Sequence, residues 1–197
     1  RQPRKAVVVT SGTHGVEGFM GSAVQAALME ESLSQWHPPP DVALVLIHAV
    51  NPYGFSWIRR TNEHNVDQNR NFLLQGEKFE GFPKGYDELN AFLNPKSPPD
   101  RYEFFRLRAV QMIAQKGLAT MKNSVAGGQY EFPKGIMFGG NRPTKSHIIL
   151  KENLPRWVGG CTEVLHVDFH TGLGRFGTYK LLVDHPWEAP RTQWLST

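Results

Sequence analysis

Residues 5–50 decide the fold and read KAVVVTSGTHGVEGFMGSAVQAALMEESLSQWHPPPDVALVLIHAV. Lys5–Thr10 is a short β-branched apolar run, which predicts a buried strand. Alanines at helical spacing predict a helix over Val16–Ser32, and the apolar run Val42–Val50 predicts a second buried strand. Strand, helix and strand in this order predict a right-handed crossover in a largely parallel sheet.

The rest of the chain continues this alternation. Phe55–Phe82 is polar and lacks periodicity, which predicts a long loop, and loops of that length are often functional. Apolar spacing predicts helices over Tyr102–Val125 and Ser146–Trp157. Two further strands are predicted, at Glu163–Phe169 and Tyr179–Val183. We therefore expect an α/β fold of three layers, α/β/α, with a mostly parallel or mixed sheet and helices on both faces.

Composition narrows the class of protein. The 197 residues, 40% of them apolar and 20% charged, fit one domain over residues 1–197. The single cysteine, Cys161, excludes an internal disulfide framework and a multi-cysteine zinc site. No apolar run is long enough for a membrane span, and no signal-peptide pattern is present, so we expect a cytoplasmic protein. The net charge is +4, but the basic residues are scattered, and we expect no nucleic-acid partner.

Polar motifs follow three of the predicted strands, where ligands bind in such sheets. His14 and Glu17 lie at the entry of the first helix, three residues apart and therefore on one face. Asn51–Phe72 follows the second strand, and Asp168 and His170 end the third. Each motif alone is a weak signal, but two histidines and a glutamate form a ligand set for catalytic zinc with one open position.

The runs SGTHGVEGF, NPYGF…RR…NVDQNRNF and DFHTGLG together resemble the zinc carboxypeptidase clan. More closely, the chain resembles an uncharacterised, largely bacterial domain-of-unknown-function family in that clan, related to the aspartoacylase and succinylglutamate desuccinylase deacylases. The resemblance covers roughly Lys5–Asp184. It implies a carboxypeptidase-like fold and a zinc-dependent hydrolase.

The resemblance also implies a role for individual residues. The ligands of one Zn²⁺ ion would be His14, Glu17 and His170. The substrate carboxylate would be held by Asn69 and Arg70, and the scissile carbonyl would be polarised by Arg60 or, as the alternative, Arg59. Asp67 would orient the first zinc histidine. From spacing alone, Asp168 shares a strand face with His170, so it is a second candidate for a carboxylate behind a zinc histidine, with a structural ion pair as the alternative.

The implied substrate is a peptide or an acylated amino acid with a free carboxylate. The clan's mechanism also uses a glutamate base from a later strand, and Glu188, the sole glutamate after His170, lies in a proline-bracketed loop. We therefore expect the base beyond residue 197, in a chain that extends on both sides of this segment, and an exposed sheet edge that favours homo-oligomers. Two alternatives remain: a metal-binding but inactive domain, and a basic anion- or nucleic-acid-binding module without metal.

Overall fold

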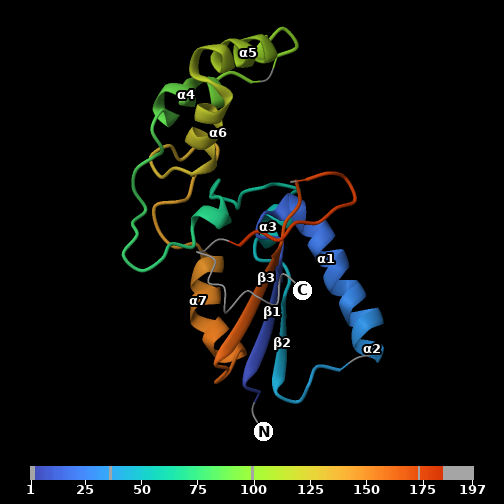
Figure 1. The fold of residues 1–197 in the computed structure, drawn as a ribbon. Helices are drawn as coiled ribbons and strands as arrows, with labels where there is room; N and C mark the ends of the chain where they lie inside the picture. The colour runs from blue at the N-terminus through green and yellow to red at the C-terminus, as the bar shows by residue number, and fades with distance from the viewer. Residues whose placement is uncertain (1–2, 36, 99, 173, 184–197) are drawn as a thin grey trace.

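A three-stranded parallel sheet lies at the base of the fold in the computed structural model, which describes residues 3–35, 37–98, 100–172 and 174–183 (Figure 1). The central strand is β1, Lys5–Ser11, flanked by β2, Val42–Ile47, and β3, Glu163–Phe169. Both neighbours run parallel to β1. The predicted α/β class and parallel pairing are confirmed.

Among the strands that the structure describes, burial is greatest on β1, because this central strand has a neighbour on each side. Ala6 and Val8 are almost fully buried. Every residue of β2 is only half-buried, so the prediction of a second fully buried strand is wrong. β2 also ends at Ile47 rather than at Val50. The reason is that β2 is an edge strand of the described sheet, so it has a neighbouring strand on one side and is less covered than the central strand.

Helices flank the sheet on two sides. The predicted helix over 16–32 starts as a 3-10 turn, Gly15–Glu17, continues as α1, Gly18–Ala27, and ends in a π turn, Leu28–Ser32, and the short α2, Leu33–Gln35. α1 lies against β1 and β3. In Figure 1, α7, Lys145–Trp157, lies on the other side of the strands from α1.

A group of three helices, α4 to α6, stands apart from the sheet in Figure 1. α4, Tyr86–Leu93, was not predicted. The single helix predicted over 102–125 is instead α5, Phe105–Lys116, and α6, Leu118–Ala126. Gly117 separates them with φ of +81°, a conformation that interrupts a right-handed helix and that glycine adopts without steric cost.

Two other segments differ from expectation or extend it. The polar segment that follows β2 begins with a one-turn helix, α3, Pro52–Ser56, whose start is capped by the Asn51 side chain. Tyr179–Val183 forms no strand, so that prediction is wrong: within the part of the chain that the structure describes, the segment pairs with none of the three strands. No described helix combines the length and apolar character that crossing a membrane requires.

Candidate metal centre

The first two candidate ligands lie where β1 ends. Gly12 turns the chain with φ of +69°, and the 3-10 turn that follows places His14 and Glu17 on one face. Gly15 allows this turn to pack on α3, because a Cβ there would lie 1.9 Å from the carbonyl carbon of Gly54. His14 Nδ1 and Glu17 Oε1 are 2.9 Å apart.

The third candidate ligand arrives from the neighbouring strand. β3 pairs with β1 up to Ser11 and Phe169, so the residues that follow both strands meet at one edge of the sheet. His170 Nδ1 lies 3.1 Å from Glu17 Oε2, and the Thr171 amide donates to the same oxygen at 2.9 Å. One donor atom from each of the three side chains lies within 4.8 Å of the others. The structure thus gathers the three predicted ligand residues in a single cluster.

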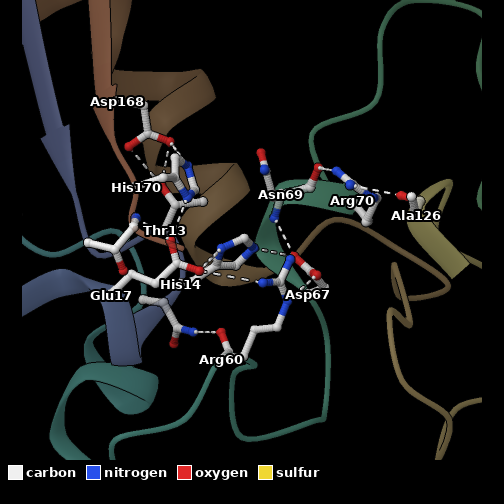
Figure 2. A network of polar contacts seen from close by, with 12 residues as sticks. Thr13, His14, Glu17, Arg60, Asp67, Asn69, Arg70, Ala126, Asp168 and His170 are labelled. Carbon is white, nitrogen blue, oxygen red and sulfur yellow. Dashed lines mark hydrogen bonds and ion pairs between the residues drawn. The ribbon is translucent and has the colours of Figure 1, made fainter. Parts of the chain in front are cut away.

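Each histidine is held from behind by a carboxylate, as Figure 2 shows. His14 Nε2 lies 2.9 Å from Asp67 Oδ1, and His170 Nε2 lies 2.7 Å from Asp168 Oδ2. The Nδ1 atoms of both rings therefore face Glu17. Metal-binding histidines characteristically use one ring nitrogen for the metal and give the other N–H to a carboxylate or carbonyl.

The ionisable side chains at the centre shift one another's pKa values toward the charged forms. Burial alone would raise the pKa of Glu17, but hydrogen bonds from His14 and His170 outweigh it and hold that pKa far below the usual range. Hydrogen bonds to Asp168 and Glu17 raise the pKa of His170 to about 9, although burial opposes this. Burial would lower the pKa of His14, yet the hydrogen bonds to Asp67 and Glu17 raise it. A metal ion must therefore displace protons that the cluster holds tightly.

The loop that carries Asp67 is braced by a second loop, residues 138–142. The Asp67 amide donates to the Phe138 carbonyl at 2.7 Å, and its carboxylate accepts from the Asn69 amide at 3.0 Å. Asn71, fully buried, donates to the carbonyls of Gly139 and Arg142. This bracing role of Asn71 was not predicted, because asparagine-rich loops also occur without such contacts.

The structure distinguishes between the two candidate arginines. Arg60 Nε donates to Asp67 Oδ2 at 2.9 Å, and Arg60 Nη1 lies 3.5 Å from Glu17 Oε1. Arg59 contributes its backbone, which pairs with Gly54 and Val16, and its side chain makes no polar contact with the described residues. Arg60 is therefore the arginine that the structure brings to the cluster.

Among the described residues, Asn69 and Arg70 form no hydrogen bond or ion pair with the three candidate ligands. Arg70 Nη1 donates to the carbonyl of Asn69 at 3.0 Å, and Arg70 Nη2 donates to the carbonyl of Ala126, at the end of α6, at 2.9 Å. In Figure 2 the guanidinium points toward Ala126 and away from His14. Glu188, the other residue weighed for a catalytic role, lies outside the described residues.

Two hydroxyl groups, one near the end of β1 and one just after it, were also missed. Thr10 and Thr13 both donate to the Asp168 carboxylate. The β1–β3 register pairs Thr10 with Asp168. Parallel pairing of residues 5–11 with residues 163–169 would have indicated the contact between Thr10 and Asp168, because the two side chains lie at matching positions of their strands.

A parallel sheet that carries a His, Glu and His donor set at one edge defines an α/β protein with a candidate metal centre. Residues 1–195 match the model of a family described as "Protein of unknown function (DUF2817)", and the chain belongs to that family. No curated protein and no solved structure matches the chain.

Proposed function

We propose that this protein is a zinc-dependent hydrolase that cleaves an amide or peptide bond next to a substrate carboxylate. The observation that carries the proposal is the cluster of His14, Glu17 and His170, in which both Nδ1 atoms face one carboxylate. The carboxylates behind the two rings also fit a metal centre, since they fix which nitrogen is presented. The sequence resemblance to the zinc carboxypeptidase clan supports the same function.

The donor chemistry favours zinc. Two imidazole nitrogens and one carboxylate oxygen are the protein ligands of many catalytic zinc sites, which keep a further position open. Bound there, Zn²⁺ would supply Lewis-acid polarisation of a carbonyl and lower the pKa of water. Glu17 is suited to hold it because its carboxylate already lies between the two histidines.

Arg60 would stabilise the oxyanion that develops on the scissile carbonyl. Its guanidinium lies beside Glu17 while its side chain remains 36% exposed, so it borders the cluster and is open to a ligand. Asp67 holds the Nε end of the group at 2.9 Å. A fixed cationic donor at the point where negative charge develops is an effective form of catalysis, since it needs little reorganisation.

Asn69 and Arg70 would bind the substrate carboxylate. For this, Arg70 must exchange the Ala126 carbonyl for the substrate, because its guanidinium is turned to α6. The exchange is favourable in principle, since an arginine makes two parallel, charge-assisted hydrogen bonds to a carboxylate and weaker ones to a neutral carbonyl. Peptides and acylated amino acids both carry such a group.

The test is hydrolysis of a panel of N-acyl amino acids and short peptides, each paired with its C-terminal amide. We expect the wild-type protein loaded with zinc to cleave members with a free carboxylate and to spare the amides. A chelator and the variant His170→Ala should each abolish turnover. Equal cleavage of acids and amides would contradict the carboxylate requirement, and turnover that survives the chelator would contradict the metal.

A second candidate function is metal binding without turnover. The carboxylates that the structure describes at the cluster are all engaged: Glu17 faces both ligand histidines, and Asp67 and Asp168 each lie behind one. None of the three is free to act as a general base. Zinc uptake with no hydrolysis of any member of the panel would favour this function over the hydrolase.

A further inference from the structure

Asp168 is the acceptor of three side-chain donors. The Thr10 hydroxyl donates to Oδ1 at 2.6 Å. The Thr13 hydroxyl lies 3.0 Å from Oδ2 and 3.2 Å from Oδ1, so it spans both oxygens. His170 Nε2 donates to Oδ2 at 2.7 Å. Two hydroxyls therefore hold the carboxylate from the β1 side, and the carboxylate also accepts a hydrogen bond from His170.

The direction of these hydrogen bonds is determined by counting protons. A carboxylate can only accept, so the single proton of the Thr10 hydroxyl points to Asp168. The Thr10 oxygen then accepts from His166 Nε2, 3.0 Å away. Thr10 and Thr13 are 3% and 4% exposed, so water has little access to compete for these bonds. Burial alone would raise the pKa of Asp168, but hydrogen bonds from His170 and Thr10 hold it below the usual value.

We propose that Thr10 and Thr13 are positioning residues that lock the Asp168 carboxylate and thereby fix His170 with its Nδ1 atom toward the metal. The inference rests on the proposed metal centre and extends it to Thr10, in β1, and Thr13, two residues after β1 ends. Among the described residues, the hydrogen bonds of the two threonine hydroxyls go to Asp168 and His166 and not to the ligand atoms of the cluster. Their effect on the metal passes through Asp168, whose oxygen fixes the His170 ring by accepting its Nε2 proton.

The carboxylates behind the two histidines, Asp67 and Asp168, are held by different partners, and the threonines act on Asp168 alone. Asp67 is paired with the Arg60 cation at 2.9 Å, so part of its charge is neutralised by a second ion. Asp168 is held by neutral hydroxyls at Thr10 and Thr13, so its charge is available to His170. A negative charge behind a histidine makes the other ring nitrogen a stronger ligand. His170 is therefore the ligand most sensitive to loss of its support.

The experiment uses the full chain and the variants Thr10→Val, Thr13→Val and the double variant, with Thr10→Ser and Thr13→Ser as rescue. Two quantities are measured at one fixed pH: Zn²⁺ affinity by competition with a chromophoric chelator, and the visible spectrum of the Co²⁺-substituted protein. We expect the double variant to bind Zn²⁺ roughly tenfold more weakly, the low end of outer-shell effects on metal sites. Its Co²⁺ spectrum should shift, and the serine variants should restore both quantities.

Ser11→Ala is the matched control. Ser11 is the next residue of β1, is completely buried and donates its hydroxyl to Gln25 at 2.9 Å, on the opposite face from Thr10. Loss of this hydroxyl should lower thermal stability and leave Zn²⁺ affinity and the Co²⁺ spectrum unchanged. If the threonines had a purely structural role, their valine variants would behave like Ser11→Ala: thermal stability would fall, and Zn²⁺ affinity and the Co²⁺ spectrum would stay unchanged.

Wild-type affinity and an unshifted spectrum in the folded valine variants would overturn the positioning role and leave the metal centre intact. A wild-type protein that takes up neither Zn²⁺ nor Co²⁺ would overturn the centre and the positioning role together. Thr13 lies outside β1, so Thr13→Val provides the decisive comparison if Thr10→Val does not fold. Its spectrum must then differ from that of wild type, and an identical spectrum would overturn the role of Thr13.

Discussion

Asp67 Oδ1 lies 2.9 Å from His14 Nε2, and the Asp67 carboxylate that makes this contact is completely buried. The same carboxylate accepts from Arg60 at 2.9 Å, so one buried anion connects a candidate ligand with a candidate catalytic cation. Burial would raise the pKa of Asp67, but the hydrogen bond to His14 and the charges of His14 and Arg60 hold it below the usual value. Asp67 therefore stays ionised behind the ligand.

The first prediction concerns this contact. Asp67→Asn keeps the size of the side chain and removes its charge, so His14 loses the anion that fixes its ring. We expect Zn²⁺ affinity to fall by about 10- to 100-fold, as for other carboxylates behind metal-binding histidines. Competition with a chelator measures this. Asp87→Asn, on the exposed surface of α4, is the control, and equal affinities in the two variants would contradict the account.

The second prediction concerns pH. In the metal-free protein, hydrogen bonds to Asp168 and Glu17 raise the pKa of His170 from 6.5 to about 9. The folded state thus holds the proton more tightly than the unfolded state does. The resulting stabilisation is complete below pH 6.5 and is lost as pH rises through 9. Thermal denaturation without metal should show a midpoint that falls across this window.

The stabilisation by zinc should have the opposite pH dependence, because the zinc ion replaces the proton on His170 and meets less competition from protons at high pH. The increase in melting temperature on adding zinc should therefore be larger near pH 9 than near pH 6.5. In His170→Ala the metal-free midpoint should depend much less on pH over this window. A wild-type midpoint that is flat or rises over the window would argue against the protonated cluster.

The third prediction separates the two arginines. On any substrate that the wild-type protein cleaves, Arg60→Ala should lower kcat by roughly 10²- to 10³-fold, the usual effect of removing an oxyanion donor. Arg59→Ala should have a much smaller effect, because only the Arg60 side chain reaches Asp67 and Glu17. Steady-state kinetics of the two variants measures the difference. The reverse order would assign the catalytic role to Arg59.

The fourth prediction concerns Arg70. A charge-assisted hydrogen bond contributes about 1.5–3 kcal/mol, so Arg70→Ala should raise KM by roughly 10- to 100-fold for substrates with a free carboxylate. Zinc content should not change, since Arg70 contacts Asn69 and Ala126 and not the ligand cluster. Kinetics and elemental analysis of the same preparation measure both quantities. Loss of zinc in this variant, with KM unchanged, would place Arg70 in a structural role.

The pattern of apolar residues between turn residues was sufficient to predict β1 and β3. It failed at Gly117, where one glycine with positive φ separates two helices that share a continuous apolar pattern. It also failed at Tyr179–Val183, since an apolar run becomes a strand only beside a partner. Apolar spacing predicts what a segment could form, and tertiary pairing decides what it does form.

In the candidate site, the sequence could predict the contacts between residues that lie close together in the chain. His14 and Glu17 share a turn, and Asp168 and His170 share a strand end, so their spacing indicated the contacts. The approach of Glu17 to His170 spans 153 residues and depends on the β1–β3 register, which spacing within either motif does not contain. Thr10 and Thr13 were missed for the same reason.

The central claim is that His14, Glu17 and His170 hold one zinc ion. Metal content by elemental mass spectrometry tests it most directly, on protein purified without an affinity-tag metal and then incubated with zinc. We expect about one zinc per chain in the wild-type protein and in His64→Ala, whose histidine lies exposed in the loop before Asp67, and none in His14→Ala/His170→Ala. A wild-type protein without zinc, or a double variant that keeps its zinc in full, would contradict the account.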